Sequence, residues 1–481
     1  MTLSTKIFYN TLAQSLGKIF AAVLALVTTG LLSQHLAEHG FGQYSTVLAF
    51  LGLFAVAADL GLYLIVVREI SKEGTDRPKI ISNALGLRLA ASVILLVIGA
   101  ALALFFPYDP VVKTSMFVGI GAFLFASLSQ VLVGVFQKHL VQHLVVVAET
   151  IARAINLLLV YLFVKESLSL PYFILAMSIA NVAQFALTFV FARRYERFGI
   201  AFDFPTWKTI LKASWPLMFA VILNLIYFRT DTVILSLFHN EETVGVYSLP
   251  YRILEGLLAF PAMFVGLLMP LLSKAAFDNW GEFKRIFQQA LDAIFLMAAP
   301  MVISVVYFAE PIIDLLKGRE DYADSPMILK ILILSAAAIF FGTLFGYTVV
   351  AVNKQKAMIW GYLAGAVIGL VLYFSLIPRF GYWGAAWGTL ATELVVAATA
   401  YYLVSKESGF NPAFKIIGRA APAVAGMAMF FHFVSLPWIL ELALGLVIYI
   451  LLLIVFRAIS MNFIKDILQP YTSFTLDKPR A

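Results

Sequence analysis

The chain has 481 residues, 62% of them hydrophobic and 13% charged, and its mean hydropathy is +0.93. In soluble domains about a quarter of the residues are charged. This composition therefore excludes an ordinary soluble domain and predicts a polytopic membrane protein. The net charge is +7 and cysteine is absent, which excludes disulfides and thiol chemistry. The six histidines have no metal-ligand spacing and the basic residues lie in short loops, so we expect no metal, cofactor or nucleic acid.

Apolar runs of about 20 residues predict transmembrane helices. We predict fourteen, which makes the fold all-α. In chain order they span residues 7–32, 43–67, 81–106, 114–136, 142–163, 171–192, 212–237, 246–272, 285–308, 327–352, 357–377, 383–404, 416–434 and 437–457. We expect the first run to be a retained helix, because the residues before it are too few and too weakly basic for a cleavable signal.

The basic residues predict which helix ends face the cytoplasm. With the N-terminus inside, 23 Lys and Arg fall in inside loops and tails, 6 in outside loops and 5 within helices. Because cytoplasmic loops carry the excess of Lys and Arg, this bias predicts that both termini are cytoplasmic and that the number of helices is even.

A short phrase that occurs twice predicts an internal duplication. Phe41-Gly42-Gln43-Tyr44-Ser45 and Val244-Gly245-Val246-Tyr247-Ser248 each follow one apolar run and open the next. Two further pairs recur at similar offsets, residues 137–138 with 353–354 and residues 171–172 with 381–382. Glycine permits a sharp turn, and tyrosine is typical of the membrane interface, so we expect Tyr44 and Tyr247 at headgroup level.

The duplication divides the predicted helices into lobes. We expect helices 1–6 in a lobe of residues 1–205, helices 7–12 in a lobe of residues 206–410, and helices 13 and 14 with a tail in residues 411–481. Many transporters are built from repeats with the site between them.

Several basic side chains lie within the predicted helices, where ionisable groups are costly and often mark a pathway. Lys18 has no acid three or four residues away and shares a polar face with Asn10 and Gln14. We expect Lys18 near mid-membrane, at the depth of Arg153 in the fifth helix. Arg88 lies nearer the cytoplasmic end and either lines a cavity or extends to the headgroups.

The acidic side chains leave alternatives open. Glu149 lies four residues before Arg153, and Glu255 three residues after Arg252, so each pair is either structural or part of a cavity. Asp59 either pairs with Arg88 or Lys18 or carries a coupling proton. Asp231 either caps its helix, pairs with Arg229 or takes part in ion coupling.

Missing motifs limit the chemistry. The sequence has no phosphate-binding loop for ATP, no nucleophile elbow and no zinc-protease motif. No predicted loop is long enough to hold a catalytic domain. We therefore do not expect an enzyme.

Six segments together carry a family resemblance. They are Asn10 with Gln14; Phe41-Gly42-Gln43-Tyr44-Ser45; Asp59-Leu60-Gly61-Leu62 with Arg68-Glu69-Ile70; Arg229-Thr230-Asp231; Val244-Gly245-Val246-Tyr247; and Asn353-Lys354. With these segments and its fourteen-helix plan, nearly the whole chain resembles the Wzx-type oligosaccharide and polysaccharide flippases. They belong to the MOP superfamily, with the lipid II flippases and the multidrug MATE exporters.

The resemblance implies a V-shaped, MATE-like pair of six-helix lobes around a cationic cavity. It implies alternating access that moves an undecaprenyl-pyrophosphate-linked oligosaccharide to the outer leaflet of the bacterial inner membrane, for surface polysaccharide such as O-antigen. Lys18, Arg88, Arg153 and Arg252 would then replace the water around the phosphates, and Asn10 and Gln14 would contact the cargo. The implied partners are the cargo, membrane lipids, a polysaccharide polymerase and a chain-length protein.

Two other functions stay open at this point. A MATE-type exporter of small cations, coupled to protons or sodium, should have a site lined by acids such as Asp59, Glu149 and Asp231. A membrane glycosyltransferase or ligase would need larger outer loops than the sequence provides.

Overall fold

The computed structural model describes residues 3–59, 61–70, 74–139, 141–317 and 322–458, and these ranges are almost entirely helical without any strand. Within the helices, the side chains of residues 3–16, 63–65, 213, 215–222 and 224–229 lie outside the described set. The predicted roles of Asn10 and Gln14, and the predicted contact of Arg229, therefore lie outside the described residues.

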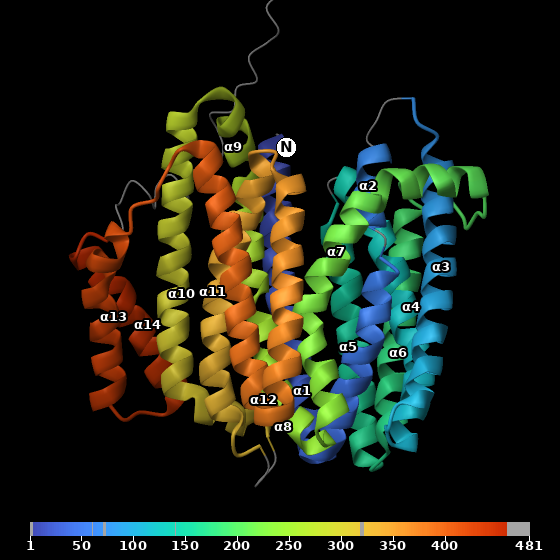
Figure 1. Ribbon diagram of the computed structural model, residues 1–481, viewed down its shortest axis with the longest axis horizontal. Helices are drawn as coiled ribbons and strands as arrows, with labels where there is room; N and C mark the ends of the chain where they lie inside the picture. Colours follow the sequence, from blue (N-terminus) through green and yellow to red (C-terminus); the bar gives the residue numbers. More distant parts are fainter. Residues whose placement is uncertain (1–2, 60, 71–73, 140, 318–321, 459–481) are drawn as a thin grey trace, which may run out of the picture.

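The helices of the first lobe occupy one half of the molecule (Figure 1). They are α1 (Leu3–Ala57), α2 (Leu62–Ile70), α3 (Arg77–Leu102) with a 3₁₀ turn at Ala103–Phe105, α4 (Pro110–Lys138), α5 (His143–Lys165) and α6 (Leu170–Ala192). The helices of the second lobe lie beside them. They are α7 (Phe204–Phe238), α8 (Glu241–Leu257), α9 (Ala259–Asp278), α10 (Trp280–Leu316), α11 (Ser325–Ala351) and α12 (Gln355–Ser408).

The last two helices form a pair at the edge of the second lobe (Figure 1). These are α13 (Lys415–Phe433) and α14 (Trp438–Val455), and both pack on α10. Phe431 meets Phe308 edge to face at a centroid distance of 4.8 Å, and the Tyr449 hydroxyl donates to the Leu296 carbonyl over 3.1 Å. These contacts fix the pair on one side of the second lobe only.

The helices agree with the predicted number of membrane passes. Eleven segments of the described chain are long and apolar enough to cross a membrane. Two of them reverse direction inside, α1 at Ala37 (φ 54°) and α12 at Gly381 (φ 54°). Since α7 adds one more pass, the described helices account for the fourteen predicted spans. Two predicted spans differ in being interrupted: the second between α1 and α2, and the eighth at Leu258, between α8 and α9.

Side-chain caps fix several helix starts. Asp76 accepts a hydrogen bond from the backbone N–H of Lys79 over 3.1 Å at the start of α3, where Pro78 lies in the first turn. Asn240 caps α8 in the same way through the N–H of Thr243 at 3.1 Å. Each cap satisfies an N–H that the helix cannot pair, so the short polar loops set where these helices begin.

The apolar core shows that the lobes are joined at one end of the bundle. One cluster contains residues of both lobes, among them Phe41 and Phe173 from the first and Tyr247 and Tyr373 from the second. Two further clusters stay within single lobes, one around Phe136 and the other around α9 to α12. We call the shared end, where α1 reverses at Ala37, the seam end. We call the opposite end, where residues 193–203 connect the lobes, the linker end. The limits of the lobes at residues 205 and 410 stay a prediction.

Candidate translocation site

The two copies of the repeated phrase meet each other at the seam end. A Cβ atom added to Gly42 of α1 would lie 1.7 Å from the Glu241 carbonyl oxygen of α8. A Cβ atom added to Gly245 of α8 would lie 2.0 Å from the Glu38 carbonyl oxygen of α1. The contact is reciprocal, as in an interface with two-fold symmetry. It supports the predicted duplication and explains why both copies contain glycine.

Hydrogen bonds reinforce this contact between the lobes, which we call the seam. The backbone N–H of Tyr322 donates to the Glu38 carboxylate over 3.2 Å, and its hydroxyl donates to the Ser33 carbonyl over 3.3 Å. The Ser33 hydroxyl donates to the Leu316 carbonyl. On the other side of the crossing, the Tyr108 and Ser236 hydroxyls lie 2.9 Å apart. The seam therefore closes one end of the space between the lobes.

The repeated tyrosines are buried inside the protein, so the expectation that they face the lipid headgroups is wrong. Tyr44 is 9% exposed and Tyr247 is fully buried, and both belong to the apolar core that the lobes share. The interfacial position fails because α1 and α8 cross at the glycines. The tyrosines that follow the glycines are thereby enclosed by the facing lobe.

Lys18 and Arg153 lie on neighbouring helices of the first lobe. A Cβ atom added to Gly17 would lie 2.1 Å from Cγ1 of Val146, so α1 touches the first turn of α5 beside Lys18. Lys18 is exposed and makes no ion pair within the described part of the chain. Arg153 follows Val146 by seven residues and thus lies about 10 Å farther along α5. The expectation that the two cations share one depth is wrong, and Lys18 is nearer the linker end.

Arg153 pairs within its own helix. Its Nη2 and Nε donate to Oε1 of Glu149 over 2.9 and 3.2 Å. Both side chains remain partly exposed. The pair fits either of the predicted roles, because an incoming anion could still reach the exposed side of the guanidinium.

Arg88 is enclosed in the first lobe and is 1% exposed. Its Nη1 lies 2.6 Å from the Asp59 carboxylate and donates to the Ala58 carbonyl over 2.7 Å. Its remaining nitrogens donate to the Ser127 hydroxyl and, over 3.3 Å, to the Gln130 amide oxygen. The side chain therefore holds the break between α1 and α2 against α4. This geometry matches the predicted pairing with Asp59 and does not present Arg88 to a cavity.

Arg252 lies in α8, seven residues beyond the crossing at Gly245. Its Nη1 donates to Glu255 over 2.9 Å, and both side chains are largely buried. Tyr44 of the first lobe lies close enough to interact electrostatically with Arg252. The cation thus lies beneath the seam, paired with Glu255 of its own helix and near Tyr44 of the other lobe.

The second lobe contains a buried acidic cluster that the sequence did not predict as a unit. Asp231 of α7 is fully buried and accepts hydrogen bonds from the hydroxyls of Tyr247, over 2.6 Å, and Thr389, over 3.2 Å. Glu393, one turn after Thr389 in α12, is 6% exposed and interacts electrostatically with Asp231. Tyr373 completes the cluster, with its hydroxyl 3.4 Å from that of Thr389. Among the described residues, Glu393 makes no hydrogen bond or ion pair with a side chain.

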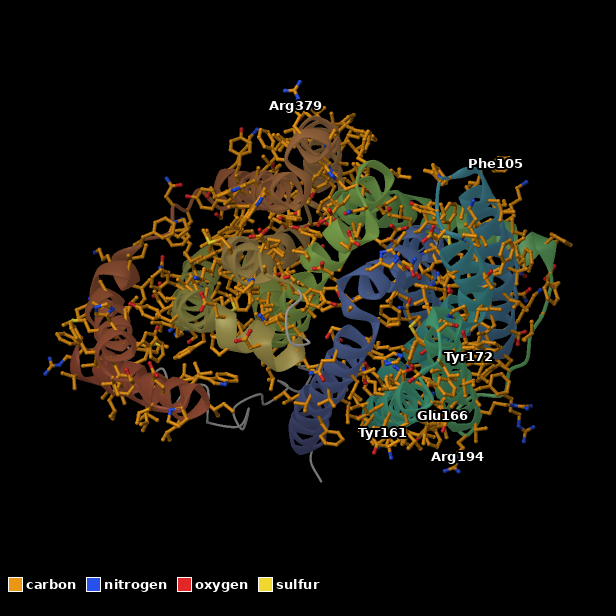
Figure 2. The ribbon with its side chains drawn as sticks, turned by 90° about the horizontal axis from the view of Figure 1, so that it is seen from below. Phe105, Tyr161, Glu166, Tyr172, Arg194 and Arg379 are labelled. Carbon is orange, nitrogen blue, oxygen red and sulfur yellow. The ribbon has the colours of Figure 1, made fainter. Side chains whose placement is uncertain are left out.

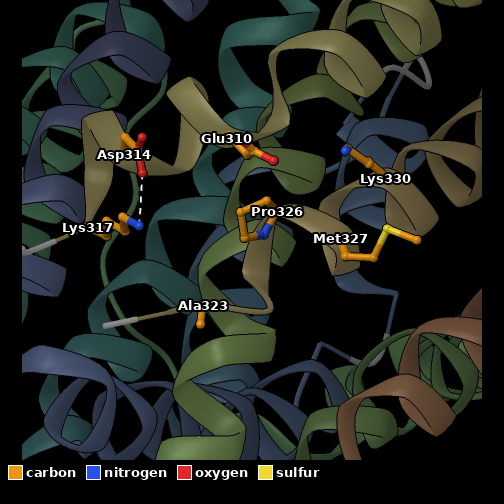
Figure 3. A pocket seen from close by; sticks show the side chains of 7 residues that line it. All are labelled: Glu310, Asp314, Lys317, Ala323, Pro326, Met327 and Lys330. Atoms are coloured by element: carbon orange, nitrogen blue, oxygen red, sulfur yellow. Dashed lines mark ion pairs between the residues drawn. The ribbon is translucent and has the colours of Figure 1, made fainter. Parts of the chain in front are cut away.

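A polar pocket opens at the seam end of the second lobe (Figure 3). It has a volume of about 390 Å³ and is lined by Glu310, Asp314, Lys317, Ala323, Pro326, Met327 and Lys330. Asp314 and Lys317 pair over 2.9 Å across its wall. The pocket lies between α10 and α11 and contains none of the predicted site residues.

These features define a class of protein: a membrane transporter with two helical lobes, which share an apolar core at one end of the membrane and are connected at the other by residues 193–203 and the first turns of α7. The chain belongs to the polysaccharide biosynthesis protein family, whose model matches residues 6–276. A second model, that of the MatE family, matches residues 216–374. Both matches confirm the predicted superfamily, in which the chain is a transporter and not an enzyme.

Relatives and solved structures agree with this assignment. A Shigella flexneri protein named "Putative O-antigen transporter" is 24% identical over 79% of this chain and 93% of its own. The Staphylococcus aureus capsular polysaccharide biosynthesis protein CapF is 24% identical over 59% of this chain and 72% of its own. The lipid II flippase MurJ, in an inward closed conformation, superposes with a TM-score of 0.74 at 14% identity, covering 95% of this chain and 99% of its own. An inward-facing MATE multidrug transporter superposes with a TM-score of 0.63 at 14% identity, covering 83% of this chain and 98% of its own.

Proposed function

We propose that this protein flips an undecaprenyl-pyrophosphate-linked oligosaccharide from the cytoplasmic to the outer leaflet of a bacterial inner membrane, for surface polysaccharide synthesis. The family match, the names of the relatives and the MurJ-like fold support a lipid-linked polysaccharide cargo. One observation carries the proposal furthest. Lys18 and Arg252 place positive charge in opposite lobes, on α1 and α8, the two helices that form the seam.

The excess of basic residues in the loops at the linker end supports an orientation with both termini in the cytoplasm. In that orientation the seam closes the outer side. Cargo would enter from the cytoplasmic side, between the Phe136 cluster of the first lobe and the α9–α12 cluster of the second, which do not share residues. A polysaccharide polymerase and a chain-length protein would act on the cargo after release.

The charges suggest how a pyrophosphate would move between the lobes. Lys18, which is exposed and nearest the linker end, would meet the phosphates first. Arg153 lies about 10 Å farther in, and Arg252 lies beneath the seam. A phosphate that draws Arg252 away from Glu255 and Tyr44 would also loosen a contact between the lobes. Rocking of the lobes would then open the outer side.

The cargo proposal predicts a charge requirement. A hydrogen bond to a charged group contributes about 1.5–3 kcal/mol, so Lys18→Gln and Arg252→Gln should each lower flipping by roughly tenfold to a hundredfold. Lys18→Arg should keep most of the activity. Arg153→Gln is combined with Glu149→Gln, so that Glu149 is not left without its partner. The measurement is complementation of surface-glycan display, with membrane abundance checked by blot.

Lys356→Gln is the matched control, because Lys356 is exposed at the linker end of the second lobe. It should display normal glycan. Normal display by Lys18→Gln, Arg252→Gln and the Arg153/Glu149 double variant, all at normal abundance, would refute the cationic path.

The acidic cluster supports a second part of the proposal, that transport is coupled to protons or sodium. Asp231, one of the predicted coupling residues, shares a buried site with Glu393, and hydroxyls surround them. Two buried carboxylates repel each other when both are ionised, so binding a proton or a cation would relieve the repulsion. Asp59 and Glu149, the other predicted coupling residues, already face Arg88 and Arg153.

Glu393→Gln should abolish the stimulation of flipping by an imposed proton or sodium gradient, while flipping without a gradient continues. The measurement uses proteoliposomes and a fluorescent lipid-linked oligosaccharide, with and without each gradient. Glu441→Gln is the control, because Glu441 is a buried acid of α14, outside both lobes. Unchanged gradient dependence in Glu393→Gln would exclude coupling at this cluster. Export of small cations in place of lipid-linked glycan would instead favour a MATE-type function, which the MatE match keeps as the alternative.

A further inference from the structure

The segment that connects the lobes is fastened to the first lobe. The backbone N–H of Ala201 donates to the Ser82 carbonyl over 3.0 Å, and the N–H of Asp203 donates to the Asn83 amide oxygen over 2.8 Å. A Cβ atom added to Gly86 of α3 would lie 1.9 Å from the Ala201 carbonyl oxygen. The segment therefore lies directly against the start of α3.

The acids of this segment are used for the same attachment. Glu196 lies within 3.0 Å of His139, 3.2 Å of Lys138 and 3.6 Å of Arg77. Although burial raises the pKa of Glu196, the hydrogen bonds from His139 and Lys138 hold it below its ordinary value overall, so it remains ionised at neutral pH. Asp203 likewise pairs with Lys79 over 3.0 Å. The negative charges of the segment thus face the lobe.

The first turns of α7 lie across the ends of α2 and α3 (Figure 1). Trp207 and Ile210 pack there against Leu62 of α2 and Leu87 of α3. Positions four residues apart share one helix face, which places Phe204, Lys208 and Lys212 together on a different face from this apolar contact. All three are exposed, Phe204 by 71%.

More exposed apolar and basic side chains lie in the segment that precedes this face. Ile200 and Phe202 are exposed, Phe202 by 56%. Arg197 is also exposed, and the nearby Arg194 projects from the periphery of the lobe (Figure 2). Within the described ranges, Arg197, Lys208 and Lys212 make no ion pair. The result is an exposed apolar and basic surface, here called the linker surface: Arg197, Ile200, Phe202, Phe204, Lys208 and Lys212.

We propose that the linker surface binds the headgroups of anionic phospholipids in the leaflet at the linker end. Aromatic and aliphatic side chains beside unpaired basic ones are what an anionic lipid interface retains, since the rings enter the headgroup boundary while the cations contact phosphates. The surface is rigidly attached to the first lobe, whereas the far end of α7 packs on α12 of the second. Bound lipid would therefore anchor the first lobe at the start of α7, the helix that continues into the second lobe.

The test uses the purified full-length protein in a neutral detergent, titrated with phosphatidylglycerol or with phosphatidylcholine while thermal unfolding is followed. Phosphatidylglycerol should raise the melting temperature and phosphatidylcholine should not. Each lysine near an anionic surface contributes about a fivefold factor in binding, so Lys208→Gln with Lys212→Gln should raise the half-maximal phosphatidylglycerol concentration about 25-fold. Phe204→Ser should raise it further.

The control pair is Lys356→Gln with Lys406→Gln, two exposed lysines of the second lobe, which should leave the titration unchanged. Equal stabilisation by the two lipids would overturn the proposal, because the surface would then not recognise the anionic headgroup. An equal shift in both double variants would overturn it too, because the lipid would then bind elsewhere. Neither outcome depends on which cargo the protein carries.

Discussion

Arg88→Met should destabilise the folded protein by about 3–5 kcal/mol. The change removes a buried guanidinium and leaves the groups that it paired without a cationic partner. Asp59, the Ala58 carbonyl and the Ser127 hydroxyl all face this one side chain. Folded proteins are stable by only about 5–15 kcal/mol, so most of the variant should be lost from the membrane. The measurement is membrane abundance together with thermal unfolding of the purified protein.

The double variant Arg88→Met with Asp59→Leu should recover much of this stability, because removing both charges leaves no buried carboxylate without a partner. Arg379→Gln is the matched control, since Arg379 projects freely from the molecule (Figure 2). A stable Arg88→Met protein that fails only in flipping would contradict the structural role and return Arg88 to the cargo path.

The number and order of the helices could be predicted because an apolar run long enough to cross a membrane has few other structures available to it. The reversals at Ala37 and Gly381 fall in the predicted gaps between runs. The break at Leu258 was not predicted, because residues 256–272 are apolar throughout, and Pro261, three residues after the break, was the one local signal. The local sequence thus determines the length and the approximate ends of each membrane span, while interruptions within a span depend on packing between helices.

The candidate site was predicted in part. Pairs within one helix, such as Glu149 with Arg153, follow from spacing alone. Contacts between helices do not, and so the sequence did not reveal that Tyr247 donates to Asp231 or that Glu393 lies beside them. The prediction that Lys18 and Arg153 share one depth failed for the same reason. Depth counted along a helix ignores how far α1 extends past α5.

The repeated glycines provide the sharpest test of the seam. Gly42→Ala and Gly245→Ala should each prevent its closure, because the added Cβ would lie 1.7 or 2.0 Å from a backbone oxygen that cannot rotate away. Alanine is about 1 kcal/mol better than glycine inside a helix, so a loss of function would not come from weaker helices. Gly256→Ala is the control on α8, because a Cβ atom there has open space around it.

Closure can be measured directly because the natural chain has no cysteine. His39 Nδ1 and Glu242 Oε1 lie 3.8 Å apart across the seam, so His39→Cys with Glu242→Cys should be joined in the closed state by a short bifunctional thiol reagent that spans the shortened side chains. We expect rapid cross-linking in the otherwise natural chain and with Gly256→Ala, and at least tenfold slower cross-linking with Gly42→Ala or Gly245→Ala, since a rise of about 1.4 kcal/mol in the closed state suffices for that factor. Glycan display should fall in the same two variants. Normal cross-linking and normal display in both would mean that the lobes do not need this glycine contact, and the alternating closure of the seam would have to be abandoned.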